Sequence, residues 1–329
     1  MSSATRLRLF ALLVIACVAG AAVAITSAIG GAGDARGPGG ALLASGEDAR
    51  PALLFRNLDR ARPQTFGQLA LTDLAPESTR TLVPLRCERV YFDGGRGICL
   101  ARGSAFAAGY RARIFGRDLK VRGEVPVEGV PSRVRISPDG RYGSTTLFVS
   151  GHSYADLGGF STTTTLIDLA RGRRIAELEQ FTATRDGRRI TAPDVNYWGV
   201  TFRRDSDRFY ATLATGGRIH LVEGSVSQRR MRTIHDDVEC PSLSPDETRI
   251  AYKQRAGPGG KRWRIHVLDL ATMRETALAE TRNVDDQVEW LDDEHVLYGL
   301  DEQIWKMPAD GSGAPAAYVP RGDSPTVVR

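Results

Sequence analysis

The chain has 329 residues, of which 42% are hydrophobic and 25% are charged. This composition is ordinary for a globular protein and excludes a wholly disordered chain. The 44 basic and 39 acidic residues leave a formal charge of +5, which is too small to indicate nucleic acid as a partner.

The first 30 residues differ from the rest in their hydrophobicity. Arg6 and Arg8 precede an uncharged stretch, Leu9–Ile29. A helix of about 20 apolar residues crosses the hydrocarbon core, and flanking arginines favour an N-terminus left in the cytoplasm. The pattern predicts an uncleaved anchor over residues 1–30, a single-pass membrane segment that places the remainder outside the cell membrane.

Two alternatives to this anchor stay open. The small residues Ala22–Ala24 have the form of a signal peptidase site, which would give a secreted protein. The residues Val14–Cys17 resemble a bacterial lipobox, which would make the chain a lipoprotein lipidated at Cys17. All three interpretations export the remainder. Residues 31–50 are rich in Gly, Ala, Asp and Arg and are expected to be a flexible linker.

Two of the four cysteines flank a turn signal. Cys87 and Cys99 lie on either side of Asp93-Gly94-Gly95. A hairpin closed at Asp93 would place the cysteines opposite each other, with Cα atoms ~4.5–5.5 Å apart, which is within disulfide range. The spacing predicts a Cys87–Cys99 disulfide. Cys240 has no evident partner and is expected to be a buried apolar residue.

A short pattern, an apolar strand that ends in an acid before a polar turn, recurs along the chain. Its acids are Asp73, Asp118, Asp168, Glu223 and Asp269, with Pro308 in a sixth, degraded copy. The copies are ~40–55 residues apart, about the length that four strands and their turns need in a propeller blade.

A second pattern, strand, tight turn and strand, lies between these copies. Its clearest turns are Ser137-Pro138-Asp139-Gly140 and Ser244-Pro245-Asp246-Glu247, and weaker copies lie at 200–209 and 288–296. Proline presets φ, aspartate bonds its own backbone and glycine tolerates positive φ, so these aspartates are expected to shape turns rather than to catalyse. The remaining segments are short and rich in β-branched and aromatic residues, which indicates an all-β chain.

The motifs at 134–142, 242–253 and 265–270 resemble the TolB-type, WD-repeat-like propellers. The resemblance implies a six-bladed β-propeller of four-stranded antiparallel blades over residues 51–329. TolB carries a separate α/β domain before its propeller, and residues 30–50 are too short to hold one.

The two ends of the chain are expected to close the ring together. Segments 52–57, 67–73 and 79–85 supply three strands of the first blade, and 324–329 resembles its missing innermost strand. Such an exchange would remove an open sheet edge. The other blades are expected at 86–127, 128–180, 193–234, 236–281 and 284–319, with a long loop at 181–192.

Acids recur in the loops that lead into the innermost strands, which lie on one face of a propeller beside its central channel. They are Glu128 before the third blade, Asp194 before the fourth, Asp236 and Asp237 before the fifth, Asp285 and Asp286 before the sixth, and Asp323 before the first, with Glu88 the nearest acid for the second. This pattern predicts an acidic channel mouth that binds a basic peptide or a cation such as Ca²⁺. Aspartate is also common in turns, so the alternative that these acids only shape the loops stays open.

Three further motifs in the sequence do not indicate a site. Gly151–Ala155 lacks the last glycine of a nucleophile elbow, the five histidines lack metal-ligand spacing, and Arg321-Gly322-Asp323 reads as a chance turn. Residues 283–305 are acidic and 102–122 are basic, which fits either solvated surface or electrostatic docking of a partner.

We therefore expect a binding scaffold of the cell envelope, a monomer with no cofactor that presents one face to another envelope protein or peptide. The alternative is a propeller enzyme of the lactonase or sugar-dehydrogenase kind that uses a metal in its channel. The sequence offers acids for such a site but no distinct catalytic set, and the fold alone does not separate the two.

Overall fold

A computed structural model describes residue 43 and residues 51–75, 79–103, 109–149 and 161–329. The predicted anchor, nearly all of the linker and Gly151–Ala155 lie outside these residues. No helix in the described part is long and apolar enough to cross a membrane. The strands belong to one compact unit, Gly39–Arg329.

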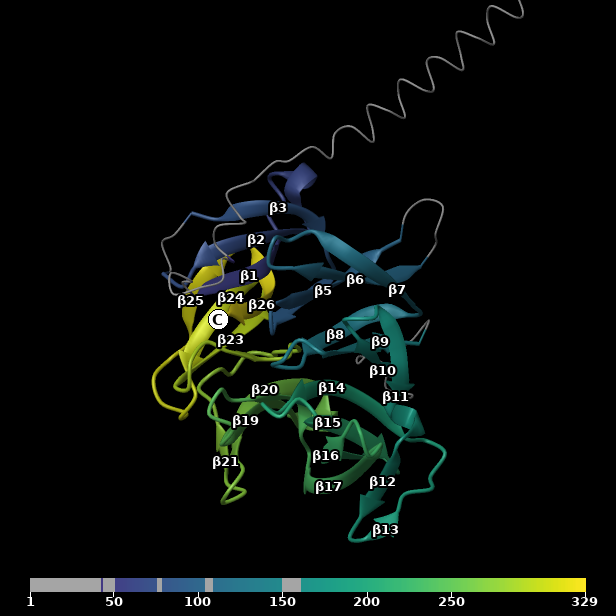
Figure 1. The fold of residues 1–329 in the computed structure, drawn as a ribbon. Coiled ribbons are helices and arrows are strands. Elements are labelled where there is room, and N and C mark those ends of the chain that lie inside the picture. The colour runs from purple at the N-terminus through teal and green to yellow at the C-terminus, as the bar shows by residue number, and fades with distance from the viewer. Residues whose placement is uncertain (1–42, 44–50, 76–78, 104–108, 150–160) are drawn as a thin grey trace, which may run out of the picture. The chain divides into compact units, whose positions relative to one another are not determined.

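The described strands form six antiparallel sheets, the blades of a propeller (Figure 1). From the innermost strand outward, blade one holds β26 (Gly322–Val328), β1 (Ala52–Asn57), β2 (Gln68–Asp73) and β3 (Thr81–Arg86); blade two holds β4 (Arg89–Asp93), β5 (Arg96–Arg102), β6 (Tyr110–Gly116) and β7 (Val121–Val127); blade three holds β8 (Val130–Ile136), β9 (Tyr142–Phe148), β10 (Thr162–Asp168) and β11 (Arg173–Glu177).

The second half of the ring is built in the same way. Blade four holds β14 (Asn196–Phe202), β15 (Arg208–Thr215), β16 (Arg218–Ser225) and β17 (Arg230–Asp236); blade five holds β18 (Glu239–Leu243), β19 (Arg249–Ala256), β20 (Arg262–Asp269) and β21 (Glu275–Ala277); blade six holds β22 (Glu289–Trp290), β23 (His295–Leu300), β24 (Gln303–Pro308) and β25 (Ala316–Pro320). Three short 3-10 helices join strands: η1 (Pro63–Thr65), η2 (Leu178–Gln180) and η3 (Pro258–Gly260). The predicted six-bladed, all-β fold is confirmed.

Each innermost strand touches the next around the ring, and β22 touches β26, so the ring closes. β26 also pairs antiparallel with β1, in the register Leu53↔Val327 and Leu54↔Thr326, and the two strands lie side by side in Figure 1. The predicted exchange between the two ends of the chain is confirmed. Apolar side chains packed between neighbouring blades supply the core, as in the buried cluster that joins Leu166 of β10 in blade three to Phe209 and Leu213 of β15 in blade four.

The repeated turn owes its shape to side-chain bonds. Asp139 accepts hydrogen bonds from the Ser137 hydroxyl at 2.6 Å and from the backbone of Arg141 at 2.9 Å, while Gly140 has a φ of 67°. A Cβ on Gly94, in the β4–β5 turn, would lie 2.1 Å from the nitrogen of Gly140, so glycine lets the two turns pack together.

Blade four is larger than the sequence indicated. Two further strands, β12 (Thr182–Arg185) and β13 (Arg188–Arg189), extend its sheet to six strands, and β12 pairs parallel with β17. The segment 181–192 was expected to be a long loop. It forms a hairpin instead, because Asp186 and Gly187 both take positive φ and the backbone groups at the edge of β17 find partners.

The Cys87–Cys99 disulfide is confirmed, with Cα atoms 5.3 Å apart. The register differs from the expectation. Val90, not Cys87, lies opposite Cys99, because the turn is centred on Gly94 and Gly95 rather than on Asp93. Both glycines have positive φ, as a tight two-residue hairpin requires. Cys240 is a buried free cysteine, as expected.

Candidate functional site

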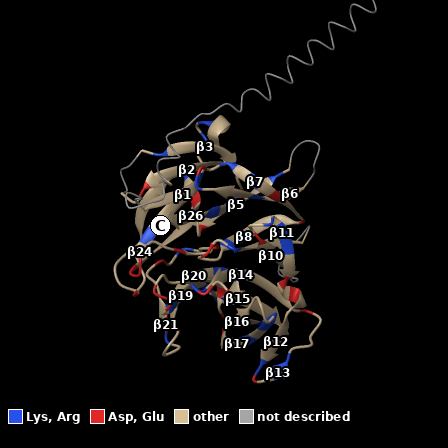
Figure 2. Cartoon of the chain, viewed as in Figure 1, with Lys and Arg blue, Asp and Glu red and all other residues tan. Residues whose placement is uncertain are grey.

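The innermost strands all begin at the same face of the ring, because turns alternate between the two ends of a four-stranded antiparallel blade. The loops that lead into these strands therefore share this face with the β1–β2 and β23–β24 turns. The space inside the six innermost strands is called the channel below, and its opening at this face is called the channel mouth. Both signs of charge gather around the centre of the ring (Figure 2).

Two buried arginines of β8 cross the channel. Arg135 donates to the backbone oxygen of Val288 at 2.7 Å, and its guanidinium lies 3.5 Å from the carboxylate of Glu289. It also stacks 4.3 Å above the ring of Tyr91. Burial raises the pKa of Glu289, and Arg135 opposes that rise. Blades two, three and six are thus tied together inside the ring.

Arg133, two residues earlier, reaches the channel mouth. Its Nη2 lies 3.0 Å from Oδ1 of Asp285, which leads into blade six. The same oxygen bonds the ammonium of Lys253, a residue of β19 whose side chain is fully buried. Burial would raise the pKa of Asp285, but the two cations outweigh burial and hold the pKa below its ordinary value.

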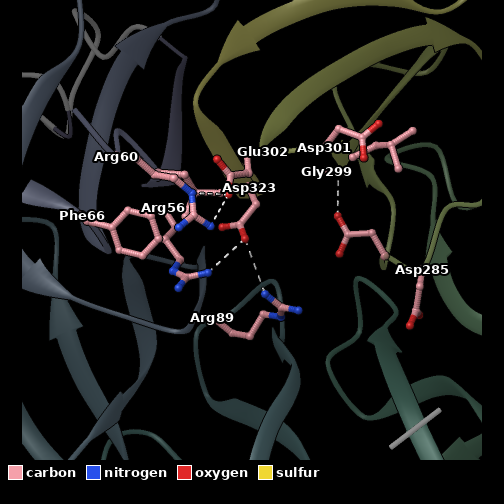
Figure 3. A pocket seen from close by; sticks show the side chains of 12 residues that line it. Arg56, Arg60, Phe66, Arg89, Asp285, Gly299, Asp301, Glu302 and Asp323 are labelled. Carbon is pink, nitrogen blue, oxygen red and sulfur yellow. Dashed lines mark hydrogen bonds and ion pairs between the residues drawn. The ribbon is translucent and has the colours of Figure 1, made fainter. Parts of the chain in front are cut away.

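A cavity of about 360 Å³ opens beside these residues at blades one, two and six (Figure 3). Five carboxylates and three guanidiniums line it, with a few apolar side chains. These residues are Asp285, Asp286, Asp301, Glu302 and Asp323, then Arg56, Arg60 and Arg89, then Leu58, Phe66, Gly299 and Leu300.

Asp323, the second residue of β26, is held by two arginines that point toward it in Figure 3. Arg56 lies 3.1 Å from its Oδ2, and Arg89 lies 3.8 Å from the same atom. Its Oδ1 is buried without a hydrogen-bond partner among the described residues. Burial raises the pKa of Asp323 more than Arg89 and Arg56 lower it. The carboxylate is therefore fixed in place with one oxygen unused.

Glu88 supplies the acid of the second blade, as its place in the sequence suggested. Its carboxylate lies 3.0 Å from Arg56, so that arginine bridges Glu88 and Asp323. Close to Arg56 and Asp323, Arg60 pairs with Glu302 at 2.5 Å (Figure 3). These ion pairs hold Arg56, Arg60, Glu88 and Glu302 in place without any ligand.

Asp286 and Asp301 differ from the other carboxylates of the cavity. Neither forms an ion pair within the described part of the chain, although Asp286 accepts a hydrogen bond from the backbone of Gly299 at 2.8 Å. Asp301 is exposed and has a φ of 52°. The carboxylates of Asp286 and Asp301 can therefore pair with a ligand, and the cavity favours a ligand with a cationic group.

The structure brings three of the seven predicted acids together, namely Asp285, Asp286 and Asp323. The other four lie elsewhere on the same face. Asp194 accepts from Thr215 at 2.8 Å and from the backbone of Gly216 at 2.7 Å, and so caps the β15–β16 turn. Glu128 and Asp237 are exposed.

Asp236, the fourth of these, ends β17, the outermost of the four strands of its blade. It bonds the buried His220 at 2.6 Å and pairs with Arg185 at 3.6 Å, and its pKa is lowered because these contacts outweigh its burial. No group of three His, Cys, Asp or Glu side chains in the described residues is arranged to hold a metal ion.

The arginines are what the sequence reasoning missed. Arg89 begins β4, and Arg133 and Arg135 alternate along β8, so their side chains point to one side of an innermost strand. The sequence Ser132-Arg133-Val134-Arg135-Ile136 shows this alternation, but it indicates only a strand unless the partners of the two arginines are known. The mouth is therefore a mixed-charge site rather than a purely acidic one.

Comparisons with known proteins agree on the fold. No family model matches the sequence, and no curated protein matches it. Among solved structures, TolB from Acinetobacter baumannii matches with a TM-score of 0.57 and 16% identity, over 85% of this chain and 66% of that one. A chain of a nidogen/laminin complex matches with a TM-score of 0.58 and 12% identity, over 85% and 98%.

A putative TolB from Agrobacterium tumefaciens matches with a TM-score of 0.49 and 12% identity, over 84% of this chain and 91% of that one. The match to the Acinetobacter TolB agrees, at the level of the fold, with the resemblance to TolB-type propellers that the turn motifs indicate. This chain spans 66% of the length of the Acinetobacter TolB chain. At these identities the likeness concerns the fold.

Proposed function

We propose that the protein is a binding scaffold of the bacterial cell envelope, anchored in the cell membrane by Leu9–Ile29, which binds a basic segment of another envelope protein or peptide at the channel mouth. The observation that carries the proposal is the cavity of about 360 Å³ with two carboxylates, Asp286 and Asp301, that have no ion pair among the described residues. The apolar N-terminal stretch, which predicts export, and the TolB-like fold support a location in the cell envelope.

The cavity suits a lysine or arginine side chain. An ammonium or guanidinium between Asp286 and Asp301 would meet two carboxylates, and the buried Oδ1 of Asp323 offers a further acceptor. Leu58 and Leu300 line the same cavity and can contact the apolar stem of such a side chain, whereas the ring of Phe66 already lies under Arg56 and Arg60. Because ion pairs already hold Arg56 and Asp323, little side-chain freedom is lost on binding.

A basic peptide fits these residues better than Ca²⁺ does. Calcium takes 6–8 oxygen ligands. The acids at the mouth face arginines instead, and no three His, Cys, Asp or Glu side chains of the described residues are arranged to hold a metal ion. The alternative of a channel-metal enzyme has no such group there to support it either.

The test compares the full chain in detergent with two variants. Replacing Asp286→Asn and Asp301→Asn together removes both unpaired charges, while asparagine can keep the bond from Gly299 and tolerates the positive φ at position 301. A trilysine peptide should bind the double variant about tenfold more weakly. Asp310→Asn, at an exposed turn residue outside the cavity, removes one charge and should leave the affinity unchanged.

The partner itself is sought by pull-down from membrane extract. The wild-type chain and Asp310→Asn should retain the same envelope protein, and the double variant should lose it. Equal capture by all three would contradict the proposed site. The anchor is tested separately, since the protein should stay with membranes in high salt and be released by detergent, and recovery of a soluble chain that begins near Ile25 would contradict it.

A further inference from the structure

A second cavity, of about 570 Å³, lies between blades two and three on the face opposite the channel mouth. It is formed by the β4–β5, β6–β7 and β10–β11 turns, which join strands at the other end of the blades. Four arginines line it, Arg96, Arg117, Arg122 and Arg171. The one carboxylate in its lining, Glu124, is engaged with Arg113 at 2.8 Å.

The four arginines form two classes. Arg122 and Arg171 are exposed, and each pairs with a carboxylate of its own turn at 2.7 Å, Asp118 and Asp168 respectively. Arg96 and Arg117 are half-buried and form no ion pair within the described residues. The inner guanidiniums of the cavity are thus the ones without a carboxylate side chain at ion-pair distance, although Arg117 lies close enough to Asp93 to oppose the rise that burial causes in the pKa of that carboxyl.

The contacts of Arg96 and Arg117 leave some of their N–H donors without an acceptor. Arg96 donates from Nη1 to the backbone oxygen of Gly140 at 2.7 Å. Arg117 lies 5.8 Å from the ring centre of Phe92, and it reaches the backbone oxygen of Leu43 and an oxygen of Arg329, the last residue, only at 3.5 Å. A guanidinium has five N–H donors, and a partly desolvated cation binds an anion more strongly than one in open water.

The rest of the lining is apolar or glycine. Ile114 and Leu169 keep 4% of their surface exposed, Ala170 is exposed, and Phe115 is fully buried. A Cβ on Gly95 would lie 3.6 Å from Nε of Arg117, so glycine keeps the space beside that guanidinium open. The volume falls within the range of ordinary small-molecule pockets. We propose that this cavity is a binding site for a small organic anion, a carboxylate or phosphate carried on an apolar group, with the anion held by Arg96 and Arg117.

The site is tested by titration of the full chain in detergent with four probes. Phenyl phosphate and phenylacetate carry the two kinds of anion on one apolar group, benzyl alcohol is the neutral counterpart, and inorganic phosphate lacks the apolar part. At least one aromatic anion should bind more tightly than both benzyl alcohol and inorganic phosphate, and which of the two binds better identifies the anion. Added salt should weaken the binding.

Variants locate the site. Arg117→Met should weaken binding of the aromatic anion about tenfold. Arg117→Lys, which keeps the charge but lacks the planar guanidinium, should weaken that binding less. Arg230→Met removes an exposed arginine of β17 and should have no effect. The Asp286→Asn/Asp301→Asn protein should bind the anion normally, so this site and the channel mouth can fail separately.

A readout on the unaltered protein guards against variants that fold poorly. Binding should shift the amide NMR signals of Gly95, Gly116 and Gly172, which line the cavity. Benzyl alcohol binding as tightly as the anions, equal affinity in well-folded Arg117→Met, or no shift at these glycines at saturating anion would each overturn the proposal.

Discussion

Arg133 and Asp285 lie on opposite blades of the ring and meet across the channel, with Nη2 3.0 Å from Oδ1. Arg133 belongs to β8 of blade three, and Asp285 leads into β22 of blade six. Lys253 of blade five bonds the same carboxylate oxygen. One carboxylate therefore pairs with two buried cations and ties three blades together at the candidate binding site.

Replacing this carboxylate should destabilise the fold. In Asp285→Asn, Arg133 and Lys253 lose the carboxylate that they share. Because the Asp285 side chain is 38% exposed, the loss should be smaller than for a fully buried pair, about 1–2 kcal/mol. Urea unfolding followed by tryptophan fluorescence should show that loss. Asp310→Asn, at an exposed turn, should change the free energy of unfolding little, and equal effects of the two would contradict this role.

The blades could be read from the sequence because their signals are local. The turn at Ser137–Gly140 is fixed by hydrogen bonds within six residues, so it has the same form wherever the chain repeats it. The exchange of β26 was also predictable, since one blade lacked an inner strand and the last residues resembled one. The hairpin at 182–189 was missed because it depends on the edge of β17, which is distant in sequence.

The site was only partly predictable, for a physical reason. The repeat placed Asp285, Asp286 and Asp323 in loops at one face, and the structure places them around one cavity. Their partners, Arg56, Arg89 and Arg133, lie far away in sequence and reach them only once the ring is closed. The charge balance of the mouth is therefore a property of the closed ring, not of any one repeat.

Stability should depend on pH through Glu179 of η2. Its Oε2 is buried without a partner among the described residues, and burial raises the pKa to about 7 from 4.5. The folded protein then binds a proton more tightly than the unfolded chain does. The free energy of unfolding should fall as pH rises from 4.5 to about 7 and level off above it.

Glu179→Gln should remove this dependence, because glutamine stays neutral and can still accept the hydrogen bond that Thr164 donates at 3.3 Å. At about pH 8 it should stabilise the protein by on the order of 1 kcal/mol, less than the pKa shift alone implies, because the glutamine NH2 group replaces Oε2 where no partner lies among the described residues. Urea unfolding at several pH values measures both effects, with Glu128→Gln at an exposed position as the control. A pH profile unchanged in Glu179→Gln would contradict this assignment.

The Cys87–Cys99 disulfide should contribute to stability as well. Its two cysteines are 12 residues apart in the sequence, and closing a loop of that size contributes about 3 kcal/mol to the free energy of unfolding. Non-reducing peptide mapping should find the pair linked, with Cys240 alkylated only after unfolding, since it is buried. Reductant should lower the Tm of the wild-type chain and leave the Cys87→Ser/Cys99→Ser variant unaffected. Native protein with both thiols open to alkylation would refute the bond.

Ring closure should depend on the last strand. Val327 and Val328 are buried, and the hydroxyl of Thr326 donates to the backbone oxygen of Phe92 at 3.3 Å, so β26 links blade one to blade two. A chain that ends at Asp323 exposes a strand edge and this core. It should lose cooperative thermal unfolding and aggregate on heating.

Complementation separates loss of this strand from general damage. A synthetic peptide of residues 322–329, added to the truncated chain, should restore tryptophan fluorescence and a Tm in a dose-dependent manner. The same peptide with Thr326→Pro should not, because proline lacks the N–H and the hydroxyl that the native strand offers between β1 and β4. A truncated chain with an unchanged Tm, or equal rescue by the two peptides, would show that β26 does not close the ring in solution.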